Sequence, residues 1–191
     1  MAAAVILSPD ERNRIAGLDD SKALSPAKRD ALFPRIMDLA WAVNWVAVEA
    51  ADCDRVGLQR ANLQALREAV LGLDVTPGFV LTDGFPVDGL PWPSLGMWKA
   101  DRVAPCVSAA SIIAKVTRDR LMDELDLVYP HYGFAQHKGY ATAAHQRRLD
   151  EYGPCPEHRL SYGNVVRTVS VARTPDRSNT NQPSSARVEA L

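Results

Sequence analysis

Short apolar runs alternate with segments of helical periodicity along this chain, and that alternation restricts it to an α/β fold. The strand-like runs are short, apolar and bounded by turn residues, and they lie at 2–7, 41–50, 79–82 and 94–99. Helices are predicted over 25–39, 58–71, from about 107 onward, and over 143–152. The length of 191 residues, 47% of them hydrophobic, suits one domain with a single sizeable core.

The overall balance of charge and cysteine excludes several classes of protein. A net charge of -1 gives no global attraction to a polyanion, so any basic surface must be local. Three cysteines that form no CxxC pair argue against a zinc knuckle or a disulfide frame and suit a reducing compartment. The first residues lack the charged start of a signal peptide, and no apolar run approaches a membrane span. We therefore expect a cytoplasmic protein with no membrane partner.

Two aspartates follow two of the predicted strands. Asp83 ends the run at 79–82, and Asp101 lies eighteen residues further on, ahead of a helix. Carboxyl ends of strands are where α/β proteins place their sites, and two carboxylates suit a hard divalent cation in phosphodiester chemistry. The alternatives are structural: Asp83 before Gly84 as a turn former, and Asp101 as a partner for the dipole of the next helix. Spacing alone leaves both interpretations open.

A loop at 137–140, with the sequence HKGY, combines a cation, a glycine and an aromatic ring. Such a loop suits contact with a phosphate and a base or sugar, although an ordinary polar turn has the same composition. The other histidines, His131, His145 and His158, lack metal-ligand spacing and are expected to be solvated or capping. Residues from 168 onward are rich in Ser, Thr, Asn, Pro and Arg. We therefore predict one domain over 1–167 and a disordered tail over 168–191.

Several longer motifs occur in a fixed order between about residues 2 and 166. They are GLDDSK at 17–22 with LS at 24–25, TDG at 82–84, KAD at 99–101, SAASIIAKVTRDR at 108–120, YGF at 132–134, HKGY at 137–140, and HR at 158–159 with Ser161. With these motifs the chain resembles the ribonuclease HII family, the bacterial type 2 ribonucleases H. The resemblance implies a ribonuclease H-like mixed sheet flanked by helices, with a helical C-terminal portion.

The resemblance also implies an activity and its residues. It implies an endonuclease that cuts the RNA strand of RNA·DNA hybrids and incises 5′ of ribonucleotides embedded in duplex DNA, using water activated by Mn²⁺ or Mg²⁺. Of the family's four metal-binding carboxylates, the third and fourth fall on Asp83 and Asp101. Tyr140 falls on the aromatic residue that reads the ribose-to-deoxyribose junction, and Lys22, Lys115 and Lys138 become candidates for phosphate contacts. The expected partners are hybrid and ribonucleotide-containing duplexes, and the expected state is a monomer.

One family motif is absent from this sequence. The family's first strand, with its Gly-x-Asp-Glu-x-Gly-Arg-Gly signature, lies at the centre of a sheet of order 3-2-1-4-5 and supplies the first two carboxylates. Asp19 and Asp20 match a different family loop and do not replace them. We therefore expect exposed strand edges on either side of the missing strand and severely reduced metal affinity and cleavage. A start codon assigned too far downstream is the simplest explanation.

Two other functions remain open at this point. One is a catalytically impaired remnant that binds nucleic acid around Tyr140 without cutting it. The other is an unrelated metal-dependent phosphohydrolase that acts on small molecules.

Overall fold

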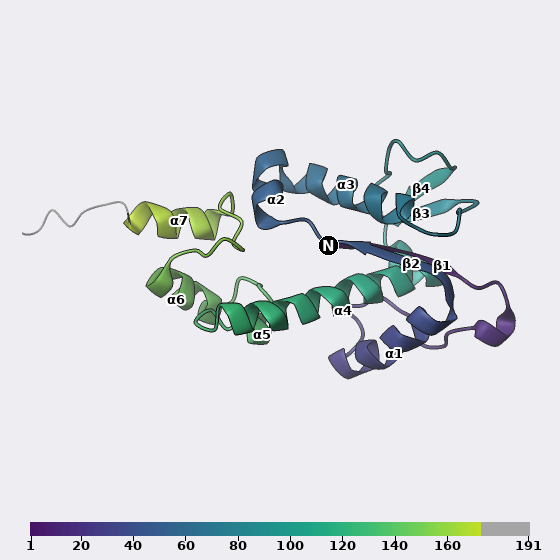
Figure 1. The fold of residues 1–191 in the computed structure, drawn as a ribbon, viewed down its shortest axis with the longest axis horizontal. Coiled ribbons are helices and arrows are strands. Elements are labelled where there is room, and N and C mark those ends of the chain that lie inside the picture. Colours follow the sequence, from purple (N-terminus) through teal and green to yellow (C-terminus); the bar gives the residue numbers. More distant parts are fainter. Residues whose placement is uncertain (173–191) are drawn as a thin grey trace, which may run out of the picture.

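A computed structural model describes residues 1–172 of the chain, with side chains described as far as Thr168 (Figure 1). The strands are β1 (Ala2–Leu7), β2 (Ala40–Val46), β3 (Val80–Asp83) and β4 (Ser94–Met97). The α-helices are α1 (Pro26–Leu39), α2 (Ala50–Val56), α3 (Leu58–Leu71), α4 (Pro105–Val128), α5 (Phe134–His137), α6 (Ala143–Tyr152) and α7 (Gly163–Ala172). Two short 3-10 helices are η1 (Glu11–Asn13) and η2 (Ala100–Arg102).

The strands form two separate pairs. β1 and β2 are antiparallel, from Ala2 opposite Val46 to Leu7 opposite Ala40, whereas β3 and β4 are parallel. Within residues 1–172 no ladder of hydrogen bonds joins β1 to β3. The expected mixed sheet is therefore present in two pieces. β1 and β3 each keep one edge without a strand partner, although Ala2, Ala4 and Val80 on these strands are buried.

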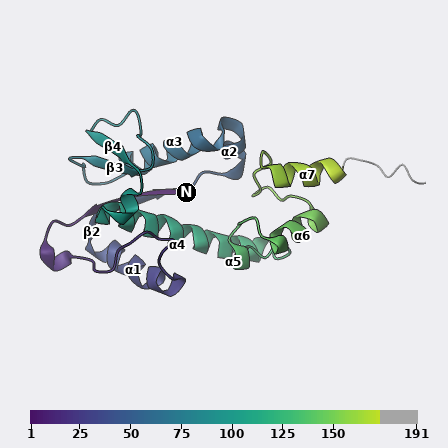
Figure 2. The ribbon, with the colours of Figure 1, turned by 180° about the vertical axis from the view of Figure 1, so that it is seen from behind.

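Helices cover both faces of the β1–β2 pair. α3 packs against β1 and β2 on one side, and α4, with α1 beside it, packs against β1 on the other; Figures 1 and 2 show the strands between these layers from opposite sides. One core cluster lies between α1, α4 and the sheet and contains Ile15, Leu24, Leu32, Ile36, Ala109, Ile112, Ile113 and Val116. A second lies beneath α3 and contains Ala2, Ala4, Ala65, Ala69, Val70 and Val80. The second cluster joins the two strand pairs through one helix.

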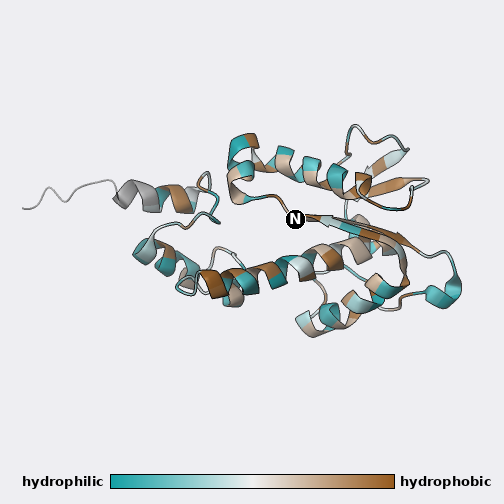
Figure 3. Ribbon diagram, in the orientation of Figure 1, coloured by the Kyte–Doolittle hydropathy of each residue, from teal (hydrophilic) through white to brown (hydrophobic). Residues whose placement is uncertain are grey.

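The helix starts and ends follow from local sequence. Ser25 caps α1 by accepting a hydrogen bond from the main-chain N–H of Lys28, and Pro26 occupies the first turn. α3 has the predicted bounds, because small apolar side chains recur every four residues and place one stripe in the core. α4 begins two residues before the predicted start at 107, with Pro105 in its first turn. It carries an apolar stripe from the sheet to the C-terminal portion (Figure 3).

The helix α2 was not predicted, because residues 41–50 were expected to form one strand. β2 ends at Val46, and α2 begins at Ala50. The carboxylate of Asp54 on α2 accepts hydrogen bonds from the main-chain N–H groups of Leu160 (2.6 Å) and Ser161 (3.1 Å). These long-range contacts stabilise a seven-residue helix that has no side-chain cap of its own.

The C-terminal portion is helical, as expected, and packs around a third cluster of Tyr132, Phe134 and Cys155. Helix α7 continues to Ala172, five residues beyond the predicted domain end at 167. The buried hydroxyl of Thr168 donates to Asp150 of α6 (3.3 Å), which extends the packed structure past that boundary. The rest of the predicted tail, 173–191, lies outside the described residues. Over residues 1–172 no helix combines the length and apolar character needed to cross a bilayer.

Candidate functional site

A cleft of about 960 Å³ lies between the unpaired edges of β1 and β3. Its walls include most of β1 on one side, β3 on the other, and side chains from α3 and α4. Four of the predicted site residues line it, namely Asp83, Asp101, Lys22 and Lys115. The structure therefore gathers into one cavity residues that lie as much as 93 positions apart in the sequence.

Asp83 is fixed at the end of β3 by the segment that carries Asp101. The main-chain N–H of Ala100 donates to Oδ1 of Asp83 at 2.9 Å. The next residue, Gly84, has a φ of +82°, and its N–H donates to the carbonyl of Met97 on β4 (2.9 Å). A residue with a Cβ is strained at this φ, so the glycine permits the chain to turn directly after the carboxylate. The Asp83–Gly84 pair is thus both a turn and a site element.

Asp101 lies in a concentration of negative charge. Its own burial raises the pKa of Asp101 above the ordinary aspartate value, and the nearby carboxylates of Asp83 and Asp20 raise it further. The buried hydroxyl of Ser108 donates to the main-chain carbonyl of Asp101 at 2.5 Å and so holds the segment against the start of α4.

Asp20 is a member of this site that the sequence interpretation placed elsewhere. Its carboxylate is buried, accepts the main-chain N–H of Lys22 (2.9 Å) and approaches Arg102 at 3.4 Å. Both interactions lower the pKa of Asp20, with the N–H of Lys22 contributing most. Nevertheless, among residues 1–168 no group of three or more His, Cys, Asp or Glu side chains has the geometry of a metal site.

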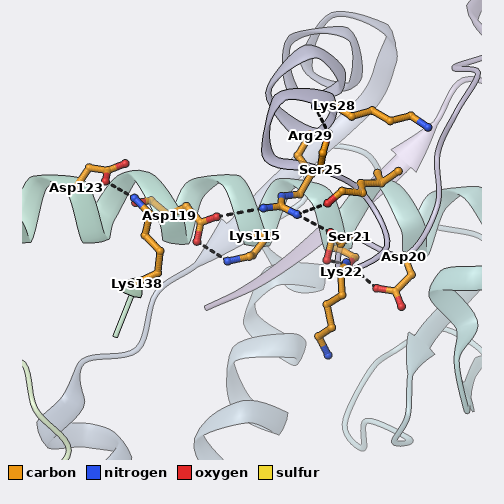
Figure 4. A network of polar contacts seen from close by, with 12 residues as sticks. Asp20, Ser21, Lys22, Ser25, Lys28, Arg29, Lys115, Asp119, Asp123 and Lys138 are labelled. Atoms are coloured by element: carbon orange, nitrogen blue, oxygen red, sulfur yellow. Dashed lines mark hydrogen bonds and ion pairs between the residues drawn. The ribbon is translucent and has the colours of Figure 1, made fainter. Parts of the chain in front are cut away.

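Lys115 is oriented by a network of polar contacts that links α1, α4 and the loop before α1 (Figure 4). Its ammonium donates to Asp119 one turn further along α4, at 2.5 Å. Asp119 also pairs with Arg29 at 3.7 Å. Arg29 is buried and donates to the carbonyls of Ser21 (2.8 Å) and Leu24 (2.6 Å). The carboxylate of Asp119 thus joins two cations of different elements, Lys115 of α4 and Arg29 of α1.

Tyr140 and Lys138 lie next to the cleft and are not part of its lining. Tyr140 is 55% exposed, and the Lys115 ammonium lies 5.4 Å from the centroid of its ring. The ammonium of Lys138 pairs with Asp123 of α4 and donates to the carbonyl of Asp119 (3.2 Å). Lys115 therefore connects an exposed aromatic ring to the cavity that holds the two aspartates.

Two cationic side chains of the cleft, Arg102 and Arg118, were not anticipated as site residues. Arg102 directly follows Asp101 in the sequence, and Arg118 lies three residues beyond Lys115, one turn along the same helix. The signal that would have indicated Arg118 is this helical spacing, which places residues three apart on one face. No comparable local signal indicates Asp20, because its contact with Asp101 depends on the tertiary fold.

Comparison with known proteins assigns the chain to a family. The family profile "Ribonuclease HII" matches residues 1–165. Over 167 residues the chain is 63% identical to the Ribonuclease HII of Cutibacterium acnes (strain DSM 16379 / KPA171202), an alignment that covers 87% of this chain and 82% of that protein.

Solved structures share the fold. The crystal structure of ribonuclease H2 from Pyrococcus horikoshii OT3 aligns with a TM-score of 0.76 at 23% identity, over 90% of this chain and 95% of that chain. The structure of Bst-RNase HIII in complex with Mn²⁺ aligns with a TM-score of 0.65 at 18% identity, over 82% of this chain and 59% of that chain. The ribonuclease H-like fold expected from the sequence is confirmed. Since the profile covers most of its length, the chain belongs to the ribonuclease HII family, whose members are ribonuclease H endoribonucleases.

Proposed function

We propose that this chain binds RNA·DNA hybrids and duplex DNA containing ribonucleotides, and that it hydrolyses the phosphodiester bond on the 5′ side of a ribonucleotide. The observation that carries the proposal is that Asp83 and Asp101 share one cleft with Lys22 and Lys115, beside the exposed ring of Tyr140. Clustered carboxylates beside cations and an aromatic ring suit phosphate chemistry on a polynucleotide better than on a small molecule.

The donor chemistry of the site fits a divalent cation. Repulsion among the carboxylates contributes to the raised pKa of Asp101, and a bound cation relieves such repulsion. Mg²⁺ is often held by one or two carboxylates, with waters and substrate phosphate completing its shell. Asp83 and Asp101 would hold it, and the Mn²⁺ complex of the structurally similar RNase HIII supports this class of ion. When bound, the ion supplies an activated water and stabilises the leaving oxygen.

The protein residues have separate roles in this proposal. The hydrogen bond from Ala100 orients the carboxylate of Asp83 without neutralising it. Lys22 and Lys115 contact phosphates from the two sides of the site. The ring of Tyr140 stacks on the sugar at the junction, where the 2′-hydroxyl distinguishes RNA from DNA. We also propose that the chain acts as a monomer, which light scattering after size-exclusion chromatography tests.

A second candidate function is nucleic-acid binding without cleavage. It is favoured by the finding that, within the described side chains, the carboxylates do not assemble into a metal site of three or more ligands. In this second candidate, Tyr140 and the lysines form a binding surface for nucleic acid, and the aspartates do not support cleavage.

A duplex with one embedded ribonucleotide separates the candidates. Because only two of the family's four carboxylates are in this sequence, we expect slow nicking 5′ of the ribonucleotide in Mn²⁺, its loss in Asp83→Asn, and its retention in Asp88→Asn. Asp88 is an exposed aspartate that does not line the cleft, so it is the matched control. Binding without nicking in the wild-type protein would support the second candidate. Absence of both binding and nicking would exclude both and favour a small-molecule phosphohydrolase.

A further inference from the structure

Three of the four histidines of the chain are buried together in the C-terminal portion, outside the cleft. His137, His145 and His158 are 8%, 6% and 7% exposed. The rings of His137 and His145 stack with centroids 4.1 Å apart, and the ring of Phe134 contacts all three imidazoles. His145 and His158 were expected to be solvated or capping, whereas His137 was part of the predicted HKGY loop. Because all three rings are buried, each ring nitrogen needs a hydrogen-bond partner. The described residues around them include no metal-binding group.

Backbone partners determine the protons on His137 and His145. A carbonyl only accepts, so Nε2 of His137 must carry the proton that it donates to the carbonyl of Tyr132 (2.8 Å). A main-chain N–H only donates, so Nδ1 of His137 is unprotonated where it accepts from Gly139 (3.2 Å). By the same reasoning Nδ1 of His145 donates to the carbonyl of Tyr140 at 3.0 Å. A neutral His145 therefore has a bare Nε2.

The third ring completes the arrangement without conflict. Nδ1 of His158 accepts the main-chain N–H of Cys155 at 3.0 Å, so the proton of His158 is on Nε2. That proton points to the bare Nε2 of His145, at 3.1 Å. All six ring nitrogens thus have a partner when all three imidazoles are neutral. An additional proton on any ring would make two hydrogen-bond donors face each other, with no acceptor between them.

The groups held by these rings are those of the loop that carries Tyr140. The network fixes the carbonyl of Tyr140 and the N–H of Gly139, in a segment where Lys138 (φ 49°) and Gly139 (φ 75°) are both left-handed. The left-handed region is unfavourable for a residue with a side chain, so the loop needs such external contacts. Arg118 of α4 adds one more by donating to the carbonyl of Lys138 (3.1 Å).

We propose that His137, His145 and His158 are positioning residues, which hold Tyr140 in place for nucleic acid and do so only as neutral imidazoles. This inference rests on the proposed role of Tyr140 in binding. A solvated histidine is protonated at mildly acidic pH, and the network requires neutral rings. The pH dependence of loop order therefore distinguishes this arrangement from a purely apolar core.

The surroundings favour the neutral state. Burial, together with the neighbouring His145 and His137, lowers the pKa of His158 to about 4. Burial also lowers the pKa of His145, and His137 acts in the same direction. The titratable or charged groups around the rings include the thiol of Cys155, the hydroxyl of Tyr132 and the guanidinium of Arg118. On the side of His137, a pocket is also lined by Asp126, His131, Arg147, Arg148 and Glu151. No hydrogen bond or ion pair within the described residues joins a carboxylate to any of the three rings.

Nitrogen NMR of the imidazole rings tests the neutral network directly, without substrate or metal. At pH 7 we expect His145 as the Nδ1–H tautomer and both His137 and His158 as the Nε2–H tautomer. His131→Gln removes the one exposed histidine and simplifies the spectrum. On acidification the amide signals of Gly139 and Tyr140 should shift together with the titration of the buried rings. A different tautomer pattern, or amide signals that ignore the titration, would overturn the inference.

A double-mutant cycle tests whether the histidines act through Tyr140. Binding of a duplex with one ribonucleotide is measured by fluorescence anisotropy in EDTA, with an all-DNA duplex for comparison. Stacking on one aromatic ring is worth about 1–3 kcal/mol, so we expect Tyr140→Ala to weaken the first duplex by about 5- to 150-fold. We expect His145→Ala to cause a loss of similar size, and the double variant to lose no more than the larger single loss. If the two single losses of affinity multiply in the double variant, the histidines do not act through Tyr140 and the inference is contradicted.

Two further variants serve as controls for losses of binding that do not arise from the hydrogen bond between His145 and the carbonyl of Tyr140. His145→Asn retains an amide that donates near the position of Nδ1, so we expect it to recover most of the binding lost in His145→Ala. His131→Ala should bind as the wild type does. Failure of the wild-type protein to prefer the ribonucleotide duplex would refute the proposed function, whereas the tautomer pattern would still decide whether the histidines hold the loop.

Discussion

The main-chain N–H of Ala100 donates to Oδ1 of Asp83 at 2.9 Å, which places the carboxylate of one strand end against the residue that precedes Asp101. Lys99, just before it, has a left-handed φ of 58°, and the chain turns there into η2. The proximity of the two aspartates is therefore produced by the backbone and does not need a bound ion. The fold therefore holds the two carboxylates close enough to repel each other.

Asp101→Asn should stabilise the protein near pH 7 and abolish nicking. An acid whose folded-state pKa is raised stabilises the fold most when protonated, and that contribution is lost as the pH rises through the raised pKa. Asparagine mimics the protonated form, so we expect a gain of about 0.5–2 kcal/mol at pH 7, typical of relieved charge repulsion. The gain should shrink as the pH falls toward 4. Urea unfolding at several pH values measures it, with Asp88→Asn as the control that should show neither effect.

Gly96→Ala, a substitution on β4, should distort the neighbouring site at Asp83 on β3. A Cβ at Gly96 would lie 2.4 Å from the main-chain nitrogen of Pro86 and 2.5 Å from the carbonyl carbon of Phe85. These are backbone atoms that cannot rotate away, so we expect destabilisation of about 1–3 kcal/mol and weaker metal binding at Asp83. Gly78→Ala is the matched control, because a Cβ there meets nothing within 4 Å. Equal unfolding midpoints for the two variants would contradict the prediction.

Arg29→Lys should be a damaging substitution although it preserves charge. A lysine has one ammonium in place of the guanidinium that reaches Ser21, Leu24 and Asp119 together. Leaving buried carbonyls unpaired costs about 1–3 kcal/mol, which thermal unfolding would detect. Arg35→Lys, on the exposed face of the same helix, should change stability by less than about 0.5 kcal/mol. A silent Arg29→Lys would show that the network does not stabilise the fold.

The lysines should differ in their effect on the salt dependence of binding. Each phosphate contact contributes about one unit to the slope of log affinity against log salt. No ion pair of Lys22 occurs among residues 1–168, whereas Lys138 is already paired with Asp123. We therefore expect Lys22→Met to reduce the slope by about one unit and Lys138→Met to reduce it by less. Lys28→Met, exposed and outside the cleft, should leave the slope unchanged.

Much of the fold follows from local patterns. The predicted bounds of α3 agree with the structure because its buried alanines recur every four positions. The start of α1 was predicted within one residue because Ser25 and Pro26 mark it. α2 was missed because its stability depends on Asp54 contacting Leu160 and Ser161, more than a hundred residues away. Local propensity has no access to such a contact.

The candidate site divides in the same way. Asp83 and Asp101 could be proposed because each follows a strand, which is a local signal. Asp20 could not, because its closeness to Asp101 depends on how the loop before α1 packs beside η2. The buried histidines were misjudged for a related reason: their partners are backbone groups of distant segments, and composition indicates only that they are polar.

Because the sheet is divided into two pairs of strands, the width of the cleft between them is not fixed by strand pairing. Asp83 lies on the β3–β4 pair, and Lys22 lies on the β1 side of the cleft. Within residues 1–172 no ladder of hydrogen bonds joins the two strand pairs and fixes the distance between them. That distance is set by the helices that contact both pairs: α4 packs against β1 and β3, and Ala65 and Ala69 of α3 belong to one buried cluster with Ala4 and Val80. Buried alanines that do not line the cleft therefore help to determine how far apart the carboxylates and the cation stand when a phosphate enters between them.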